Sequence, residues 1–404
     1  MKKITTIISL FFLTMGVGMA ARMPYSQKMV YSQMSRCKDA SYLDYREGKY
    51  KWNYTPGLEL KAFLDVFDCY GDEKILEYAD HWYDTLIAED GSITGYKISN
   101  YSTDHICPAR TLFYLYDKTG KEKYRKAMDL VMKQIETHPR TSDGALWHKK
   151  VYPHQLWLDG VYMAEPFYAE YVSRYFPQDK KAEAFKDVVN EFLVAAKHCY
   201  DPKTGLFRHA WDESKSMPWA DPVTGQSAHC WGRALGWYCM AAVDVLDIIP
   251  TETEGRDQLI ETLAGILNVL PEFTDVKDGA WYQVLDCPGR EGNYIESTCT
   301  AMFVYSYLKA IRMGYIEKSW LPHAKKMYKY MVKQFIQEDK TGSICGKSCC
   351  KAISLTRCCE VGGLGGKNNR MGDYKYYLSE PIRDNDSKGT GPFIWASLEM
   401  EKLK

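Results

Sequence analysis

The amino-acid sequence predicts an all-α fold, a single (α/α)6 toroid in which six inner helices are surrounded by six outer ones. Three observations lead to this prediction: apolar residues recur at helical spacing in twelve segments, consecutive segments form pairs joined by short turns, and the two members of a pair differ in composition. The predicted helices are 24–36, 57–70, 72–89, 101–118, 121–137, 157–175, 180–199, 227–248, 254–271, 294–313, 316–336 and 391–403.

The turns between paired helices share one arrangement. Gly71, Gly120, Pro177 and Gly314 each stand where one helical pattern stops, and an acidic residue follows within three positions. Gly and Pro end helices, and an acid near the start of the next helix interacts favourably with its N-terminal dipole. The chain is therefore a series of helical hairpins.

The two helices of a hairpin have different surroundings. Residues 157–171 are aromatic and nearly uncharged, which is typical of a helix buried on all sides, whereas residues 180–197 alternate charged and apolar side chains, which is typical of an outer helix. The repeat interval is irregular, so an enzyme toroid is indicated rather than a solenoid of uniform repeats. We expect residues 21–404 to form one domain.

The predicted helices leave long irregular segments between them. Their places in the alternation put them all at one face of the toroid, and long ordered loops in a compact domain usually serve function. We therefore expect the functional site among residues 90–100, 138–156, 200–226, 272–293 and 337–390.

Residues 1–20 have the layout of a secretory signal peptide. Lys2 and Lys3 precede an uncharged apolar run, and small residues stand before a predicted cleavage after Ala20. The run is too short for a comfortable membrane span; a retained N-terminal anchor is the alternative. We expect an exported, soluble protein, periplasmic or secreted, with no membrane association after the signal is removed.

Charge and cysteine content exclude some partners. The 52 basic and 52 acidic residues cancel, which argues against nucleic acid or an anionic membrane as a partner. Aromatic residues make up 14% of the chain, which is compatible both with sugar binding and with a Tyr-rich core. The thirteen cysteines cluster only within residues 345–359, where adjacent Cys-Cys pairs fit zinc-ligand spacing poorly. Free buried thiols, or one or two disulfides, are expected there instead.

Asp159 is the leading candidate for catalysis. It is the one acid in the apolar run Trp157–Met163 at the head of a predicted inner helix. A carboxyl group in such surroundings loses solvation, so its pKa is expected to rise and keep a proton available for general acid catalysis. The alternative is that Asp159 only caps its helix.

Asp104 and His209 occupy related positions. Asp104 stands one helix pair before Asp159, so the two carboxyl groups can point into one site, where proximity would push their pKa values apart. Helix capping is again the alternative. A lone histidine is more often structural, but His209 lies among aromatic and charged residues in a segment expected to face the site.

Arg233 is an isolated charge at the head of another predicted inner helix. No other charged residue follows until Asp244. A buried guanidinium without an anion is unfavourable, so Arg233 indicates a ligand that carries a carboxylate. A salt bridge to Asp104 or Asp159 is the alternative interpretation.

Together these motifs resemble the unsaturated rhamnogalacturonyl hydrolases of glycoside hydrolase family 105, which are related to the unsaturated glucuronyl hydrolases of family 88. The similarity spans roughly residue 50 to the C-terminus. The segments that carry it are Thr103–Ile106, Trp157–Met163, Leu206–Asp212, Trp231–Trp237, Asn293–Ser297 and Asp384–Phe393. The chain departs from the usual pattern at Ala234-Leu235, where many members carry Gly-Asn, which leaves the sugar preference open.

The resemblance implies an (α/α)6 barrel without a metal or other cofactor. It also implies substrates left by polysaccharide lyases, oligosaccharides that end in a uronic acid with a C4=C5 double bond. Asp159 takes the position of the family's catalytic acid and Asp104 that of its second carboxylate. The positions implied for substrate contact are His209, Arg233 and Trp237, with Trp157, Trp231 and His148 as further lining residues.

The resulting hypothesis is a hydrolase that hydrates a vinyl ether, with Asp159 as general acid and base. Substrates of the rhamnogalacturonan or pectin type are expected, and a glucuronyl hydrolase acting on other polysaccharide fragments is the alternative. A sugar epimerase on the same toroid would need paired histidines, and a non-catalytic sugar-binding protein would need the tryptophans without a protonated acid.

Overall fold

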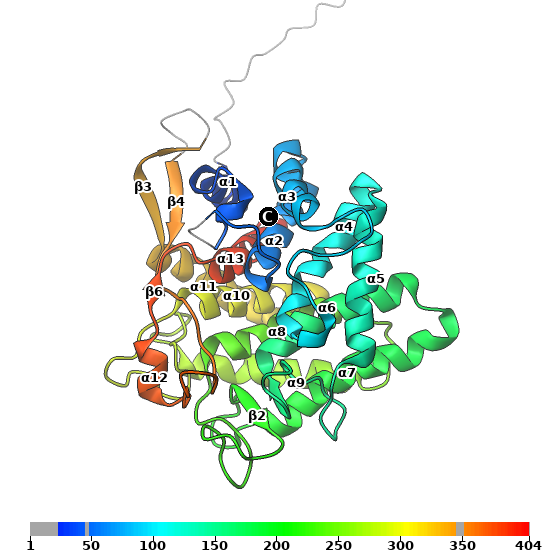
Figure 1. Cartoon of the computed structure of the whole chain (residues 1–404). Helices are drawn as coiled ribbons and strands as arrows, with labels where there is room; N and C mark the ends of the chain where they lie inside the picture. Colours follow the sequence, from blue (N-terminus) through cyan, green and yellow to red (C-terminus); the bar gives the residue numbers. More distant parts are fainter. Residues whose placement is uncertain (1–22, 45–47, 345–350, 404) are drawn as a thin grey trace, which may run out of the picture.

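The computed structural model describes residues 23–44, 48–344 and 351–403, so the predicted signal peptide lies outside the described residues. The inner helices run along the centre of the molecule (Figure 1). They are α2 (Tyr54–Tyr70), α4 (Arg110–Thr119), α6 (Leu158–Tyr175), α8 (Gly232–Val245), α10 (Ser297–Met313) and α13 (Ser387–Lys402). The outer helices are α1 (Tyr25–Arg36), α3 (Glu73–Leu86), α5 (Glu122–Thr137), α7 (Gln178–Cys199), α9 (Arg256–Val269) and α11 (Leu321–Phe335).

The inner helices form a closed ring. Each contacts the next in the order α2, α4, α6, α8, α10, α13, and α13 returns to contact α2. Each inner helix from α2 to α10 also contacts the outer helix that follows it, whereas α13 is covered mainly by α1 from the other end of the chain. The predicted (α/α)6 toroid is therefore confirmed, and its last hairpin joins the first and last described helices.

Burial follows the predicted division into inner and outer helices. Every residue of α8 is buried, and α10 is buried from Ser297 to Ile311. In α5 the buried side chains, among them Tyr124, Met128 and Val131, recur at helical spacing on one face. The turn glycines Gly71 and Gly120 adopt left-handed φ angles of 73° and 65° after their helices, a conformation that a side chain would disfavour.

The prediction of one helix over residues 101–118 is wrong in its first half. Residues 103–105 and 107–109 form separate 3-10 turns, η3 (Thr103–His105) and η4 (Cys107–Ala109), and α4 begins only at Arg110. The backbone N–H of Thr103 donates to the carbonyl of His148, outside any helix. Pro108 has no N–H to donate and disfavours helical backbone at the residue before it, so a continuous helix does not form.

The inner helix predicted over residues 227–248 starts later than expected. Residues 227–231 are not helical: the backbone N–H of Ser227 donates to the carbonyl of Ala210, and the backbone N–H of His209 donates to the carbonyl of His229. The helix α8 then begins at Gly232. These backbone bonds tie the segment before α8 to the segment around His209.

Short strands and one short helix lie in segments that the sequence analysis treated as irregular or helical. The strands form three antiparallel pairs, and β3 and β4 lie beside α1 as a hairpin (Figure 1). These elements are β1 (Gln155–Trp157), β2 (Ala210–Asp212), β3 (Ile336–Ser343), β4 (Lys351–Leu355), β5 (Cys358–Cys359), β6 (Ile382–Arg383) and helix α12 (Tyr374–Ser379).

The described cysteines, which include Cys358 and Cys359, are free thiols, and both of these are buried. The prediction of free buried thiols holds for these two residues, and Cys345, Cys349 and Cys350 lie outside the described residues. Among the helices of the described residues, none is long and apolar enough to cross a membrane.

Two acids are buried between α6 and α7. Glu165 is 2% exposed and Glu191 is 3% exposed, and the nearby Arg140 is already paired with Asp187 at 2.8 Å. Glu191 accepts a hydrogen bond from the backbone N–H of Leu146, but burial still raises its pKa to about 8. A carboxyl group whose pKa is raised in the folded state stabilises the fold below its unfolded pKa, and this contribution disappears as the pH rises through the folded pKa.

Glu191 is therefore expected to lower the stability of the protein as the pH rises from about 4.5 to about 8, by up to ~1.4 kcal/mol per pH unit. Glu191→Gln should remove this contribution from the profile, because the amide cannot ionise. Urea unfolding between pH 4.5 and 8.5 measures the effect, with exposed Glu183→Gln on the same helix as control. Parallel profiles for the wild type and Glu191→Gln would contradict the assignment.

Candidate active site

Asp159 and His209 lie next to each other because a short ladder joins their backbones. Strand β1 pairs with β2 with Trp157 opposite Ala210, and the N–H of Leu158 donates to the carbonyl of His209 at 3.1 Å. Nε2 of the His209 ring lies 3.1 Å from Oδ2 of Asp159. The carboxylate stands in the first turn of α6, where the helix dipole stabilises negative charge.

The structure corrects the expected direction of the Asp159 pKa. The side chain is only 14% exposed, and burial does push its pKa upward. However, the hydrogen bond from His209 and the charge of Arg233 outweigh burial and hold the pKa below its ordinary value. The prediction of a raised pKa in the free protein is thus wrong, because the partner of Asp159 is fifty residues away in the sequence.

Tyr377 holds the other side of the His209 ring. Its hydroxyl lies 2.8 Å from Nδ1 of His209, and both residues are fully buried. When the tyrosine donates to Nδ1, the proton of the neutral ring sits on Nε2 and is donated to Asp159. Tyr377 thereby fixes the tautomer that supports the carboxylate, and nothing in its local sequence singled it out.

Asp104 forms an ion pair with Lys149. Nζ of Lys149 lies 2.5 Å from Oδ2 of Asp104, and Nε2 of His148 lies 3.9 Å from Oδ1. Burial raises the pKa of Asp104, but the charge and the hydrogen bond of Lys149 lower it further than burial raises it. The expectation that Asp104 and Asp159 push each other's pKa values apart is wrong, because each carboxylate has a separate basic partner.

His148 packs between the two acids and stacks on a tryptophan. Its ring is nearly parallel to that of Trp157, with centroids 4.5 Å apart, and Tyr152 stacks on the same tryptophan at 5.0 Å. Burial, together with the charge of Lys149, lowers the pKa of His148 to about 3, so the ring is neutral near neutral pH. Gly160 leaves room for the His148 ring, since a Cβ at this position would lie 3.3 Å from Nδ1 of His148.

Arg233 is a buried cation without a carboxylate partner. It is 2% exposed, its guanidinium carbon lies 4.5 Å from the ring centroid of Trp231, and Nη1 donates to the carbonyl of Cys359. Throughout the described chain, no carboxylate lies within ion-pair distance of this guanidinium, so the salt bridge considered from the sequence is not present. The cation–π contact offsets only part of the free-energy cost of removing an arginine side chain from water.

Tyr54 and Trp237 contact each other near Arg233. Trp237 follows Arg233 by one helical turn, is 1% exposed and contacts the ring of Tyr54 edge to face. Burial raises the pKa of Tyr54, Asp104 and Asp159 raise it further, and Arg233 lowers it. Tyr54 is thus close enough to all three charged groups to respond to each of them.

All eight residues that the sequence indicated lie in this one region. His148, Trp157, Asp159, His209 and Trp231 form a chain of direct contacts. Asp104 joins through His148, Arg233 through Trp231, and Trp237 through Tyr54. The sequence analysis missed Lys149, Tyr377 and Tyr54, because each acts through a partner that is distant in the chain.

Comparison with known proteins gives a family and several similar proteins. The model of the family described as Glycosyl Hydrolase Family 88 matches residues 25–404. A solved family 105 glycoside hydrolase from C. acetobutylicum ATCC 824 is 41% identical, covers 94% of this chain and 100% of its own, and has a TM-score of 0.87. The chain is also 24% identical, over 67% of its length and 74% of the relative's, to the unsaturated rhamnogalacturonyl hydrolase YesR of Bacillus subtilis strain 168.

A more distant structure shares the fold alone. The unsaturated glucuronyl hydrolase from Bacillus sp. GL1 is 14% identical, covers 94% of this chain and 95% of its own, and has a TM-score of 0.66.

We expect His209→Ala to raise the pKa of Asp159, because burial remains while the hydrogen bond that opposes it is lost. His209→Gln, which keeps a side-chain donor, should raise it less. Carbon-detected NMR of protein labelled at the aspartate carboxyl carbon, with Asp159→Asn for assignment, measures the titration. An unchanged Asp159 titration in His209→Ala would show that another group holds the pKa down.

Proposed function

We propose that this chain, which belongs to glycoside hydrolase family 88, removes a terminal uronic acid with a C4=C5 double bond from oligosaccharides that polysaccharide lyases produce. Fragments of the rhamnogalacturonan or pectin type are the proposed substrates, supported by the similarity to YesR and to the family 105 structure. Family membership makes the chain a glycosidase, which replaces the epimerase and sugar-binding alternatives.

The observation that carries the proposal is the buried charge of Arg233 beside Asp159. A uronic acid brings a carboxylate, and this carboxylate would provide the anion that the guanidinium lacks in the protein. The same contact orients the sugar ring over Asp159. Trp231, on which the guanidinium stacks, keeps Arg233 in place before substrate arrives.

In the proposed reaction the carboxyl group of Asp159 donates its proton to C4 of the double bond. Positive charge develops at C5 and is shared with the ring oxygen. Water adds at C5 while Asp159, now a carboxylate, takes a proton from it. The resulting hemiketal opens, and the bond at C1 to the next sugar then breaks without direct attack at C1, unlike hydrolysis by two carboxyl groups that flank that carbon.

Substrate binding also explains how Asp159, whose pKa is lowered in the free protein, gains the proton that it donates. Arg233 is one of the charges that hold the pKa of Asp159 down. A bound uronate would neutralise this charge, place its own negative charge nearby and exclude water, and each of these effects raises the pKa of a carboxyl group. We infer that Asp159 takes up its proton as the substrate binds.

Asp104 has a supporting role in this proposal. Its ion pair with Lys149 holds it ionised and fixes its position, which suits a carboxylate that accepts a hydrogen bond from a sugar hydroxyl. The same ion pair weakens it as a nucleophile at C1. Asp159 has a side-chain hydrogen bond only with His209 among the described residues, and in this proposal it is the carboxyl group that gains the exchangeable proton when substrate binds.

Isotopic labelling tests the reaction. Cleavage in heavy water should place deuterium at C4 of the released uronic acid, and cleavage in oxygen-18 water should place the label at C5, because the proton and the hydroxyl enter at these carbons. Asp159→Asn should reduce the rate by about 10²–10⁴-fold. Oxygen-18 at C1, with no deuterium at C4, would identify a conventional glycosidase instead.

The pH dependence tests the coupling between Arg233 and Asp159. We expect kcat to persist to higher pH than kcat/KM, because kcat reports Asp159 in the complex and kcat/KM reports it in the free enzyme, where its pKa is lowered. A substrate with a methyl-esterified uronate brings no charge and should show little separation between the two profiles. Coincident profiles for the free acid substrate would contradict proton uptake on binding.

A further inference from the structure

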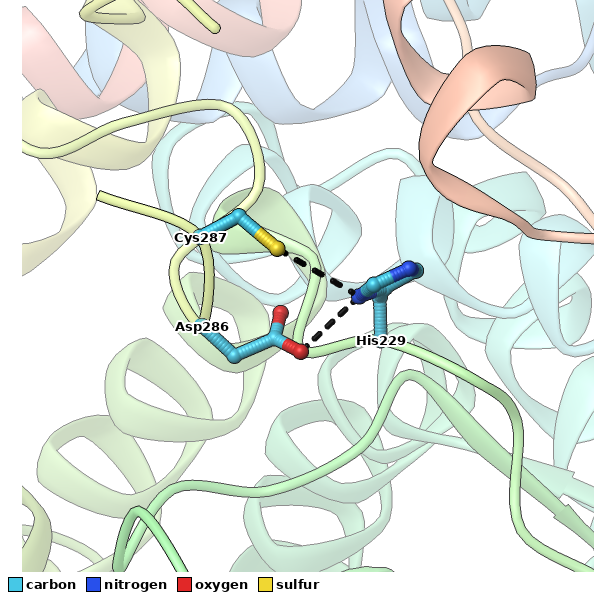
Figure 2. A group of neighbouring side chains, drawn as sticks. All are labelled: His229, Asp286 and Cys287. Carbon is cyan, nitrogen blue, oxygen red and sulfur yellow. Dashed lines mark hydrogen bonds and ion pairs between the residues drawn. The ribbon is translucent and has the colours of Figure 1, made fainter. Parts of the chain in front are cut away.

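A second cluster of reactive side chains lies next to the segment that leads into α8. His229 precedes α8, and Asp286 and Cys287 lie in the segment before α10 (Figure 2). Oδ2 of Asp286 is 2.8 Å and Sγ of Cys287 is 3.9 Å from Nδ1 of His229. All three donor atoms lie within 4.8 Å of one another, and all three side chains are partly buried.

The arrangement differs from that of a nucleophilic triad. In a triad the nucleophile and the carboxylate contact different nitrogens of the histidine, so that the ring passes a proton between them. Here the carboxylate and the thiol both approach Nδ1 (Figure 2). One nitrogen, one oxygen and one sulfur that lie within 4.8 Å of one another are close enough to share one metal ion.

We propose that His229, Asp286 and Cys287 bind one Zn²⁺ ion, with a water molecule as the fourth ligand. Imidazole, carboxylate and thiolate are the three ligand types that zinc uses in proteins, and a thiolate disfavours Mg²⁺ and Ca²⁺. Tetrahedral bonds to zinc put N and S about 3.6 Å apart and N and O about 3.3 Å apart. The observed 3.9 Å and 2.8 Å each differ from these by about 0.5 Å or less.

Charge and hydrogen bonding at the cluster are compatible with a divalent ion. The backbone N–H of Cys230 donates to Oδ1 of Asp286 and orients the carboxylate with Oδ2 toward His229. When the ion binds, the thiol proton leaves to solvent, and the imidazole changes tautomer so that Nε2 carries its proton and Nδ1 is free to bind; the thiolate and carboxylate then balance the two positive charges.

Two arginines stand near the cluster and have other partners. Nη1 of Arg208 is 4.0 Å from Oδ2 of Asp286, and this guanidinium also forms an ion pair with Asp201 at 3.1 Å. Arg290 stacks on Tyr374, with Nη1 4.0 Å from Sγ of Cys287. Each guanidinium would therefore keep another partner when Asp286 and Cys287 bind zinc.

The ion would fix the segment that carries part of the site. The carbonyl of His229 accepts the backbone N–H of His209 at 3.2 Å, and Trp231 and Arg233 follow two and four residues later. Zinc would hold this segment to the loop that contains Asp286 and Cys287. Its role is structural, and the proposal does not depend on the reaction that the site performs.

The test uses the full chain without an affinity tag, freed of metal with a chelator and then dialysed. Titration with Zn²⁺ alone, followed by elemental analysis, should give one ion per chain, and Co²⁺ should produce a thiolate-to-cobalt absorption band. Cys287→Ser should lose this band and at least ~10-fold in zinc affinity, since even indirect partners of zinc ligands contribute that much. Zinc should raise the Tm of the wild type by at least ~2 °C but not that of Cys287→Ser.

Two variants serve as matched controls. Cys69→Ser removes an exposed thiol elsewhere, and His323→Gln removes a histidine paired with Asp278 at 2.5 Å. Both should keep full zinc stoichiometry and the cobalt band, and melting curves check that each variant is folded. Zinc affinity that is equal in the wild type and in folded Cys287→Ser, or cobalt binding without the thiolate band, would overturn the proposal.

Discussion

The site depends on the common direction of the inner helices. Because each inner helix is followed by an outer helix that runs back, the N-terminal ends of the inner helices collect at one end of the ring. Tyr54 is the first residue of α2, and Asp159 and Arg233 are in the first turns of α6 and α8. The carboxylate of Glu296, which caps α10, accepts the backbone N–H of Cys359, whose carbonyl accepts a hydrogen bond from Arg233.

This direction gives the region an electrostatic character that no single residue has. Helix N-termini carry partial positive charge and unpaired N–H groups, so several of them around one point favour anions. The two site carboxylates satisfy part of that preference, and each has a basic side chain beside it. Among the described residues, no carboxylate lies within ion-pair distance of Arg233, so its charge favours an acidic sugar over a neutral one in this region.

The sequence predicted the fold, and it indicated eight residues that the structure brings into one region, for reasons that lie largely in local pattern. Helices buried on all sides differ in composition from outer helices, and Asp159 and Arg233 are isolated charges in apolar runs. The resemblance to family 105 added His148 and the tryptophans. Local pattern failed for the pKa of Asp159, because it depends on the distant His209. The 3-10 turns before α4 were missed although Pro108 is a local signal against a continuous helix.

Three site residues could not be found in this way. Lys149 is one of many lysines until Asp104 is seen 2.5 Å away, and Tyr377 is one of 31 tyrosines until its hydroxyl is seen beside His209. Tyr54 acquires its importance only because α2 begins next to α8 in space. Such roles arise from tertiary contacts and leave no trace in spacing or composition.

The hairpin of α1 and α13 has a consequence for biosynthesis. Ser26 donates to a carboxylate oxygen of Glu401 at 2.6 Å, and Ser387 donates to Glu59 at 2.6 Å, so residues more than 300 positions apart close the ring. Contacts of such high sequence separation form slowly. During translation, the apolar flanks of α2 and α10 stay uncovered until residues 387–402 leave the ribosome. A nascent chain stalled before that point is therefore an open ring with two exposed edges, a natural target for chaperones or proteases.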